Sequence, residues 1–142
     1  MQDTDLAIVD RAVAFAREKG ADLIVSVGGG SVIDTAKAVC VTLKNGGKAD
    51  DHVALMRLTE PQIPHIAIPT TSGTGSQVTH FSALYLDGVK YSVGHPFVLP
   101  AVAIVDPALT FSMPAALTAS TGVDALSQGM ESMWAVCATK EE

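Results

Sequence analysis

The chain has 142 residues, of which 48% are hydrophobic and 17% are charged, and its net charge is −6. This length suits one domain with a core of its own, and the acidic balance argues against nucleic acids and anionic membranes as partners. The charged fraction is below the level of about 25% that is usual for soluble domains. We therefore expect some apolar surface to meet a partner or a further part of the protein.

The N-terminal residues lack the basic and apolar regions of a secretion signal, and no run approaches the roughly 18 apolar residues of a membrane helix. The two cysteines, Cys40 and Cys137, stand in no metal-binding or redox spacing. These features predict a cytoplasmic protein with reduced thiols and no membrane partner.

The first half of the chain predicts alternating helices and strands. Apolar residues recur at helical spacing over 5–19, and a β-branched run at 23–27 predicts a parallel strand covered on both faces. Glycines and a serine at 28–31 then lead into a second helix over 32–43. This order is typical of a doubly wound parallel sheet.

The middle of the chain predicts a second strand and its loop. Residues 44–64 resemble a surface crossover with one short helix, and 65–69 predicts another buried strand. The loop at 70–79 is rich in hydroxyl groups and glycine. Segments 80–86 and 89–93, separated by Asp87-Gly88, predict a hairpin, because Asp-Gly supplies the positive φ angles of a tight turn.

The last part of the chain predicts one more strand and then helices. We expect a third core strand at 101–105, a helix that opens near Pro114, and a restart at Thr121-Gly122 that continues to about Val136. The predicted organisation is an α/β domain over 1–110 followed by the beginning of a helical domain over 111–142.

The glycine turn is the first candidate binding site. Three residues without a Cβ, Gly28, Gly29 and Gly30, let a phosphate approach the backbone, and the N–H groups and dipole of the following helix attract its charge. Ser31 can cap that helix or donate its hydroxyl to the ligand. An ordinary tight turn remains the alternative, since glycine-rich turns are common.

The hydroxyl-rich loop at 70–79 follows the second predicted strand directly. Because the carboxyl ends of neighbouring parallel strands lie at one edge of a sheet, the two polar loops would form a crevice suited to the phosphates and riboses of a dinucleotide. The alternative interpretation is a flexible linker, which seldom follows a buried strand.

Polar side chains gather on one side of the predicted helix near 122–131. A solvated polar face is one interpretation; the other is that Asp124 and Gln128, one turn apart, bind a divalent cation through oxygen. The histidines form no ligand spacing and suit edge or loop positions, and no Ser-His-Asp or Cys-His arrangement follows from spacing. We therefore predict no catalytic residue.

Four motifs together resemble the iron-containing (group III) alcohol dehydrogenases. They are Gly28-Gly29-Gly30-Ser31-Val32-Ile33-Asp34-Thr35-Ala36-Lys37, Pro69-Thr70-Thr71-Ser72-Gly73-Thr74-Gly75-Ser76, Asp106-Pro107-Ala108-Leu109-Thr110 and Thr121-Gly122-Val123-Asp124-Ala125-Leu126. The resemblance implies an oxidoreductase with a Rossmann-like N-terminal α/β domain, an all-helical C-terminal domain, and a divalent metal, iron or zinc, in the cleft between them.

The resemblance also implies roles for individual residues. The cofactor, NAD or NADP, would contact the glycine turn at Gly28, Gly29, Gly30 and Ser31, and also Thr70, Thr71, Thr79, Phe81, Lys90 and Leu109. Asp124 would be the first metal ligand, with Gln128 where the family usually has a histidine. An amide oxygen is a weaker ligand than imidazole for Fe²⁺ or Zn²⁺.

Two further expectations follow from the resemblance. Family members are several hundred residues long, so this chain corresponds to a middle portion without the later histidine ligands. The segment from Asp124 to Trp134 resembles a branch of phosphonoacetaldehyde reductases, whereas the related glycerol-dehydrogenase and dehydroquinate-synthase-like enzymes fit the two glycine-containing motifs less well.

The sequence therefore predicts part of an NAD(P)- and metal-dependent alcohol dehydrogenase or aldehyde reductase. We expect it to be inactive alone, to act as a homo-oligomer on small alcohols or aldehydes, and to bind no nucleic acid. The alternative is a stand-alone nucleotide-binding or oligomeric interaction module without catalysis.

Overall fold

The computed structural model describes residues 5–53, 58–86 and 88–136, so Asp87 and Cys137 lie outside the described residues. The predicted order of helices and strands in the first half is confirmed. The elements are α1 Leu6–Glu18, β1 Ile24–Gly28, α2 Gly30–Asn45, α3 Ala49–Val53 and β2 His65–Pro69. Asp5 caps α1 by accepting the N–H of Ala7 at 2.9 Å, and α2 ends at Gly46 with a φ of 76°.

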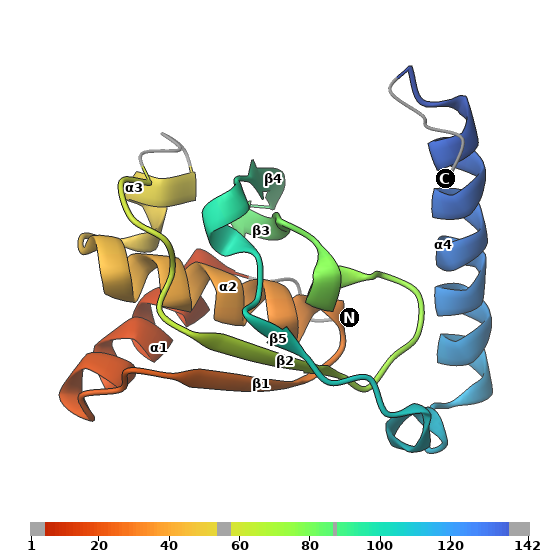
Figure 1. Ribbon diagram of the computed structural model, residues 1–142, viewed down its shortest axis with the longest axis horizontal. Coiled ribbons are helices and arrows are strands. Elements are labelled where there is room, and N and C mark those ends of the chain that lie inside the picture. The colour runs from red at the N-terminus through yellow and green to blue at the C-terminus, as the bar shows by residue number, and fades with distance from the viewer. Residues whose placement is uncertain (1–4, 54–57, 87, 137–142) are drawn as a thin grey trace.

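Three parallel strands form a sheet in the order β1-β2-β5, where β5 is Val102–Ala103. Helix α2 packs against β1 and β2, and α1 packs against α2 on that same side (Figure 1). The prediction that β1 is covered on both faces was wrong for the described residues. Ser26 is buried toward the helices, whereas Val25 and Val27 are 51% and 56% exposed, because no described element covers the opposite face.

The third strand was predicted too long and too buried. β5 has only two residues, and residues 101–105 are all exposed. It pairs with β2 through Ile66 and Ala67 on one side only, and Asp106-Pro107 then turns the chain into the 3₁₀ helix Pro107–Thr110. A short strand at the edge of a sheet has few neighbours to bury it.

The predicted hairpin is confirmed as β3 Phe81–Leu86 and β4 Val89–Gly94, paired antiparallel, with Gly88 at a φ of 77°. This hairpin packs on the side of α2 that faces away from the three-stranded sheet (Figure 1). The main core lies between α1, α2 and the hairpin. Its buried members are Leu6, Val9, Val13, Ala38, Val39, Val41, Ala49, Leu84, Val93 and Val98.

The C-terminal part is a single helix, α4, over Ala115–Trp134. The predicted restart at Thr121-Gly122 is therefore wrong. A glycine inside a helix costs only about 1 kcal/mol relative to alanine, and the Thr121 hydroxyl donates to the Leu117 carbonyl at 3.0 Å, within the preceding turn. α4 stands to one side of the rest of the molecule (Figure 1), and none of its residues is buried.

Candidate functional site

Two polar loops begin side by side at the carboxyl edge of the sheet. Gly28, the last residue of β1, is in register with Pro69, the last residue of β2, and the Thr70 N–H donates to the Gly28 carbonyl at 3.0 Å. The glycine turn and the 70–79 loop are therefore neighbours in space. Parallel sheets commonly bind ligands at this edge.

The three glycines of the turn lie in close packing, which is tightest at Gly28 and Gly30. A Cβ on Gly28 would lie 2.7 Å from the Val32 Cβ, one on Gly29 would lie 3.2 Å from the Thr71 hydroxyl, and one on Gly30 would lie 2.8 Å from the Thr74 methyl group. The absent side chains thus let α2 approach β1 and let the 70–79 loop approach the turn. Two threonine hydroxyls come next to the start of α2 as a result.

This arrangement fits a phosphate group of a dinucleotide. Gly29 is the N-cap of α2 and Gly30 its first residue, and no backbone hydrogen bond among the described residues uses their N–H groups. Ser31 is exposed on the first turn, and it is not the cap that the sequence allowed. The helix dipole, the amides and the hydroxyls of Thr71 and Thr74 all favour an anion at this place.

A cavity of about 200 Å³ lies beyond the glycine turn. It brings together three of the predicted cofactor residues, Thr79, Phe81 and Lys90, although they come from the 70–79 loop, β3 and β4. The remaining lining residues are Asp34, Thr74, Ser76, Ala83 and Ser92. Hydroxyl groups, an ammonium group and a half-exposed aromatic ring suit the ribose and phosphate parts of a nucleotide.

Asp34 and Lys37, which the sequence did not single out, join α2 to the segment that lines this cavity. The Lys37 ammonium is fully buried and donates to the carbonyls of Thr79 and Phe81 at 2.8 and 2.5 Å. Burial lowers the pKa of Lys37 to about 8, and the nearby Asp34 carboxylate opposes this shift. The sequence does show a lysine within a mostly apolar part of a predicted helix, which is a sign that Lys37 could be buried. The sequence does not show which groups the Lys37 ammonium would contact.

His65 is fully buried, and the predicted edge position is wrong. Its Nε2 lies 2.8 Å from the Ser26 hydroxyl, whereas its Nδ1 has no hydrogen-bond partner among the described residues. Burial, together with the charge of Lys37, lowers the pKa of His65 to about 4. This histidine is therefore neutral at pH 7 and belongs to the core rather than to the cavity.

The other predicted site residues are not brought to the cavity. Leu109 lies in the 3₁₀ helix before α4 and is partly exposed. Asp124 and Gln128 lie one turn apart on the exposed helix α4. That helix meets the loop near Gly73, where a Cβ would lie 2.5 Å from the Thr121 carbonyl oxygen.

The described donors do not complete a metal site. Asp124 and Gln128 offer one carboxylate and one amide oxygen, and no group of three His, Cys, Asp or Glu residues gathers anywhere in the described part of the chain. Zinc in proteins takes at least three protein ligands. The described residues alone thus do not fit a closed iron or zinc centre.

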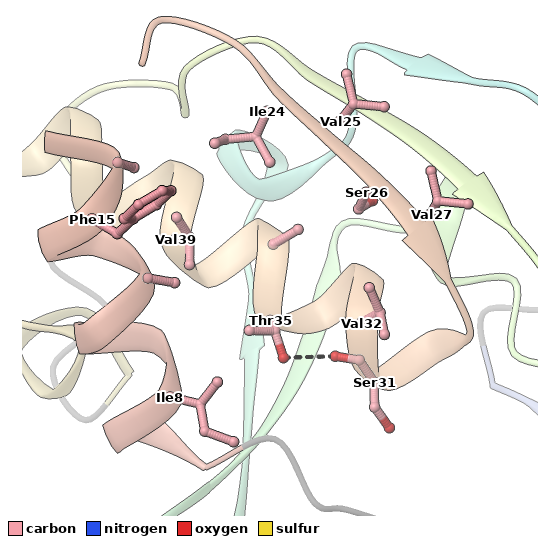
Figure 2. Close-up of a pocket in the computed structure, with 13 residues that line it drawn as sticks. Ile8, Phe15, Ile24, Val25, Ser26, Val27, Ser31, Val32, Thr35 and Val39 are labelled. Carbon is pink, nitrogen blue, oxygen red and sulfur yellow. Dashed lines mark hydrogen bonds between the residues drawn. The ribbon is translucent and has the colours of Figure 1, made fainter. Parts of the chain in front are cut away.

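A larger apolar groove of about 600 Å³ lies between α1, β1 and α2 (Figure 2). Phe15 is 63% exposed at this groove, which also reaches Val25 and Val27 of β1, although the side chains of these two valines point to the uncovered face of the strand. Ser31 of the glycine turn lies at its end, where its carbonyl accepts the Thr35 hydroxyl at 2.7 Å. The groove is one exposed apolar surface of the described residues, and α4 exposes further apolar side chains, such as Leu126 and Trp134.

Within the described residues, no helix is both long and apolar enough to cross a membrane.

Comparisons with known proteins agree with this architecture. The family model described as iron-containing alcohol dehydrogenase matches residues 1–107. A long-chain-alcohol dehydrogenase of Geobacillus thermodenitrificans is 46% identical over 133 residues, which cover 92% of this chain and 34% of that protein. The chain therefore spans about a third of the length of the curated relatives it matches.

Solved structures of similar proteins have the same fold over the length of this chain. The structure of a 1,3-propanediol oxidoreductase superposes with a TM-score of 0.92 and 34% identity, covering 99% of this chain and 37% of that chain. The structure of a sulfoacetaldehyde reductase from Bifidobacterium kashiwanohense in complex with NAD⁺ superposes with a TM-score of 0.86 and 36% identity. The match covers 94% of this chain and 36% of that chain. The matched motifs, the parallel sheet and these likenesses together place the chain in the iron-containing alcohol dehydrogenase family.

Proposed function

We propose that this chain is the dinucleotide-binding part of an NAD(P)-dependent alcohol dehydrogenase or aldehyde reductase that also uses a divalent metal. The observation that supports this most directly is the meeting of the glycine turn, the start of α2 and the 200 Å³ cavity at one edge of the sheet. The relatives named as alcohol dehydrogenases and aldehyde reductases support the reaction class.

In this proposal the chain binds and orients the cofactor. The N–H groups of Gly29 and Gly30, with Ser31, hold the pyrophosphate after the close turn at Gly28. The rest of the cofactor site is lined by Thr70, Thr71, Thr79, Phe81, Lys90 and Leu109. The nicotinamide, when bound, supplies hydride transfer, and the protein contributes position and charge.

The proposed metal site belongs to the whole enzyme, because this chain supplies only part of its ligands. Asp124 is the proposed first ligand, with Gln128 beside it, and further ligands are required to complete the set. We therefore propose a division into an α/β domain over 1–110 and the start of a helical metal-binding domain over 111–142. By itself the chain is expected to have negligible dehydrogenase activity.

The test is a calorimetric titration of the purified chain with NADH and with NADPH, each with and without Fe²⁺ or Zn²⁺. We expect one nucleotide site, no gain from metal, and an affinity that falls by up to about 5-fold in Lys90→Met, since an exposed lysine at a phosphate contributes up to about 1 kcal/mol. Lys48→Met, at an exposed lysine outside the cavity, is the matched control.

Absence of heat with both nucleotides contradicts the proposed function. Robust metal-dependent oxidation of NADH or NADPH with an aldehyde contradicts the proposal that the chain alone is inactive.

The apolar groove favours a second candidate, a nucleotide-binding or interaction module without catalysis that assembles as a homo-oligomer. The exposed Val25, Val27 and Phe15 at this groove are the observation behind it. Light scattering separates the two: a stable oligomer that binds nucleotide without metal favours the module, whereas aggregation favours part of a larger enzyme and a monomer contradicts the module.

A further inference from the structure

Six hydrogen bonds connect the first half of α2 with the segment that lines one wall of the cavity. Asp34 accepts the Ser76 hydroxyl through Oδ1 and the Ala83 N–H through Oδ2 at 3.0 Å, and its carbonyl accepts the Ser82 hydroxyl at 3.0 Å. Lys37 supplies the other three, to the Thr79 carbonyl and hydroxyl and to the Phe81 carbonyl. The bonds thus hold the 76–83 segment at its beginning, middle and end.

The burial of Lys37 shows that these bonds do more than fill space. An ammonium group withdrawn from water costs several kcal/mol unless it is well bonded, and an apolar side chain of similar size is often at least as stabilising. An apolar side chain cannot form directional hydrogen bonds to particular carbonyl groups. The Lys37 ammonium donates to the carbonyl of Thr79 in the loop and to that of Phe81 at the start of β3, and it lies 3.8 Å from the Asp34 carboxylate. It therefore fixes the path of the chain from the loop into β3.

The two residues differ in their access to a ligand. Asp34 lines the cavity, whereas Lys37 does not and is fully buried beneath it. Lys37 can therefore act on a ligand only through the residues that it holds. Those residues are Thr79 and Phe81, both of which line the cavity.

We propose that Lys37, supported by Asp34, is a positioning residue that locks the 76–83 segment in the conformation that receives the dinucleotide. This inference rests on the proposed function and adds to it one residue, Lys37, that sets affinity without touching the ligand. Because the segment is ordered before binding, its ordering entropy is not lost at the moment of binding.

The test compares the unaltered chain with Lys37→Met, which keeps the length of the side chain and removes the donors. The second variant is Asp34→Asn. It replaces one carboxylate oxygen, which accepts a hydrogen bond from the Ser76 hydroxyl or the Ala83 N–H, by an amide NH₂ group that cannot accept one. Thr42→Val, an isosteric change at a buried position further along α2, is the control. Hydrogen exchange is measured at the amides of residues 81–83 and of α1, and affinity for NADH and NADPH by calorimetry.

We expect both variants to speed exchange at residues 81–83 by about tenfold, to leave α1 unchanged, and to weaken nucleotide binding by about tenfold. Thr42→Val is expected to change neither quantity. Equal acceleration in α1 and in 81–83 overturns the proposal, because it indicates a general loss of packing. Faster local exchange with unchanged affinity also overturns it.

Failure of the proposed function has a different signature. In that case the unaltered chain itself binds neither nucleotide. The exchange measurement still decides whether Lys37 holds the segment, and unchanged exchange at 81–83 in Lys37→Met overturns the inference by itself.

Discussion

Replacement of Gly28 by alanine is expected to lower the free energy of unfolding by about 1–3 kcal/mol, as is typical of an overpacked core. The new methyl group would lie 2.7 Å from the Cβ of Val32. That atom is fixed to the backbone of α2, so it cannot turn away as the end of a side chain can. Relief requires α2 to move away from β1, which also displaces the turn that we propose to hold phosphate.

Denaturant unfolding followed by circular dichroism checks this prediction. Gly129→Ala is the matched control, because a Cβ there meets nothing within 4 Å and the position is inside α4. That change is expected to stabilise α4 by about 0.5–1 kcal/mol. If Gly28→Ala proves as stable as the unaltered chain, the tight approach of α2 to β1 does not contribute to stability.

The second large effect is a loss of stability as the pH falls from about 6.5 to about 4. The unfolded chain has His65 at its ordinary pKa near 6.5, whereas burial and the Lys37 charge hold the folded pKa at about 4. Between these values the unfolded state binds a proton that the folded state does not. Unfolding is therefore favoured as pH falls, by up to about 3 kcal/mol at pH 4 and below.

The pH dependence has a structural cause in the unpartnered Nδ1. A protonated His65 would place a second N–H in the core, where no described residue accepts it. Unfolding free energies measured from pH 7 to 4 for the unaltered chain and for His65→Gln are expected to converge as the pH falls. His80→Gln, at an exposed histidine, is the control.

Direct titration of His65 by NMR keeps this prediction testable when the variant folds poorly. A ring that stays neutral down to about pH 4 agrees with it. A His65 that titrates near 6.5 in the folded chain contradicts it.

Much of the local structure was predictable because it depends on neighbouring residues. Helical spacing gave α1 within one residue at each end, and Gly88 with its positive φ suited the predicted hairpin. The same local reasoning failed at Thr121-Gly122. A glycine lowers helix stability only modestly, and its effect there was too small to end α4.

The candidate site was predictable only in part. Sequence order placed polar loops after two strands, and the parallel register of Gly28 with Pro69 made them neighbours. The approach of Thr74 to Gly30 was not predictable, because it depends on how the loop folds back over the turn. The cavity needed the hairpin to bring Lys90 of β4 to the same cavity as Thr79 of the 70–79 loop.

By itself the sequence determined the order of helices and strands and the glycine turn, since each of these depends on residues close together in the chain. It also determined the family resemblance, through the order of four motifs that are each a short run of residues. Only the tertiary structure decided that Lys37 is buried, that its ammonium holds Thr79 and Phe81, and that no described element covers one face of β1. The physical reason is that the environment of a side chain is set by segments far away in sequence. A charged residue on a helix has the same local pattern whether it faces water or the carbonyls of a distant loop.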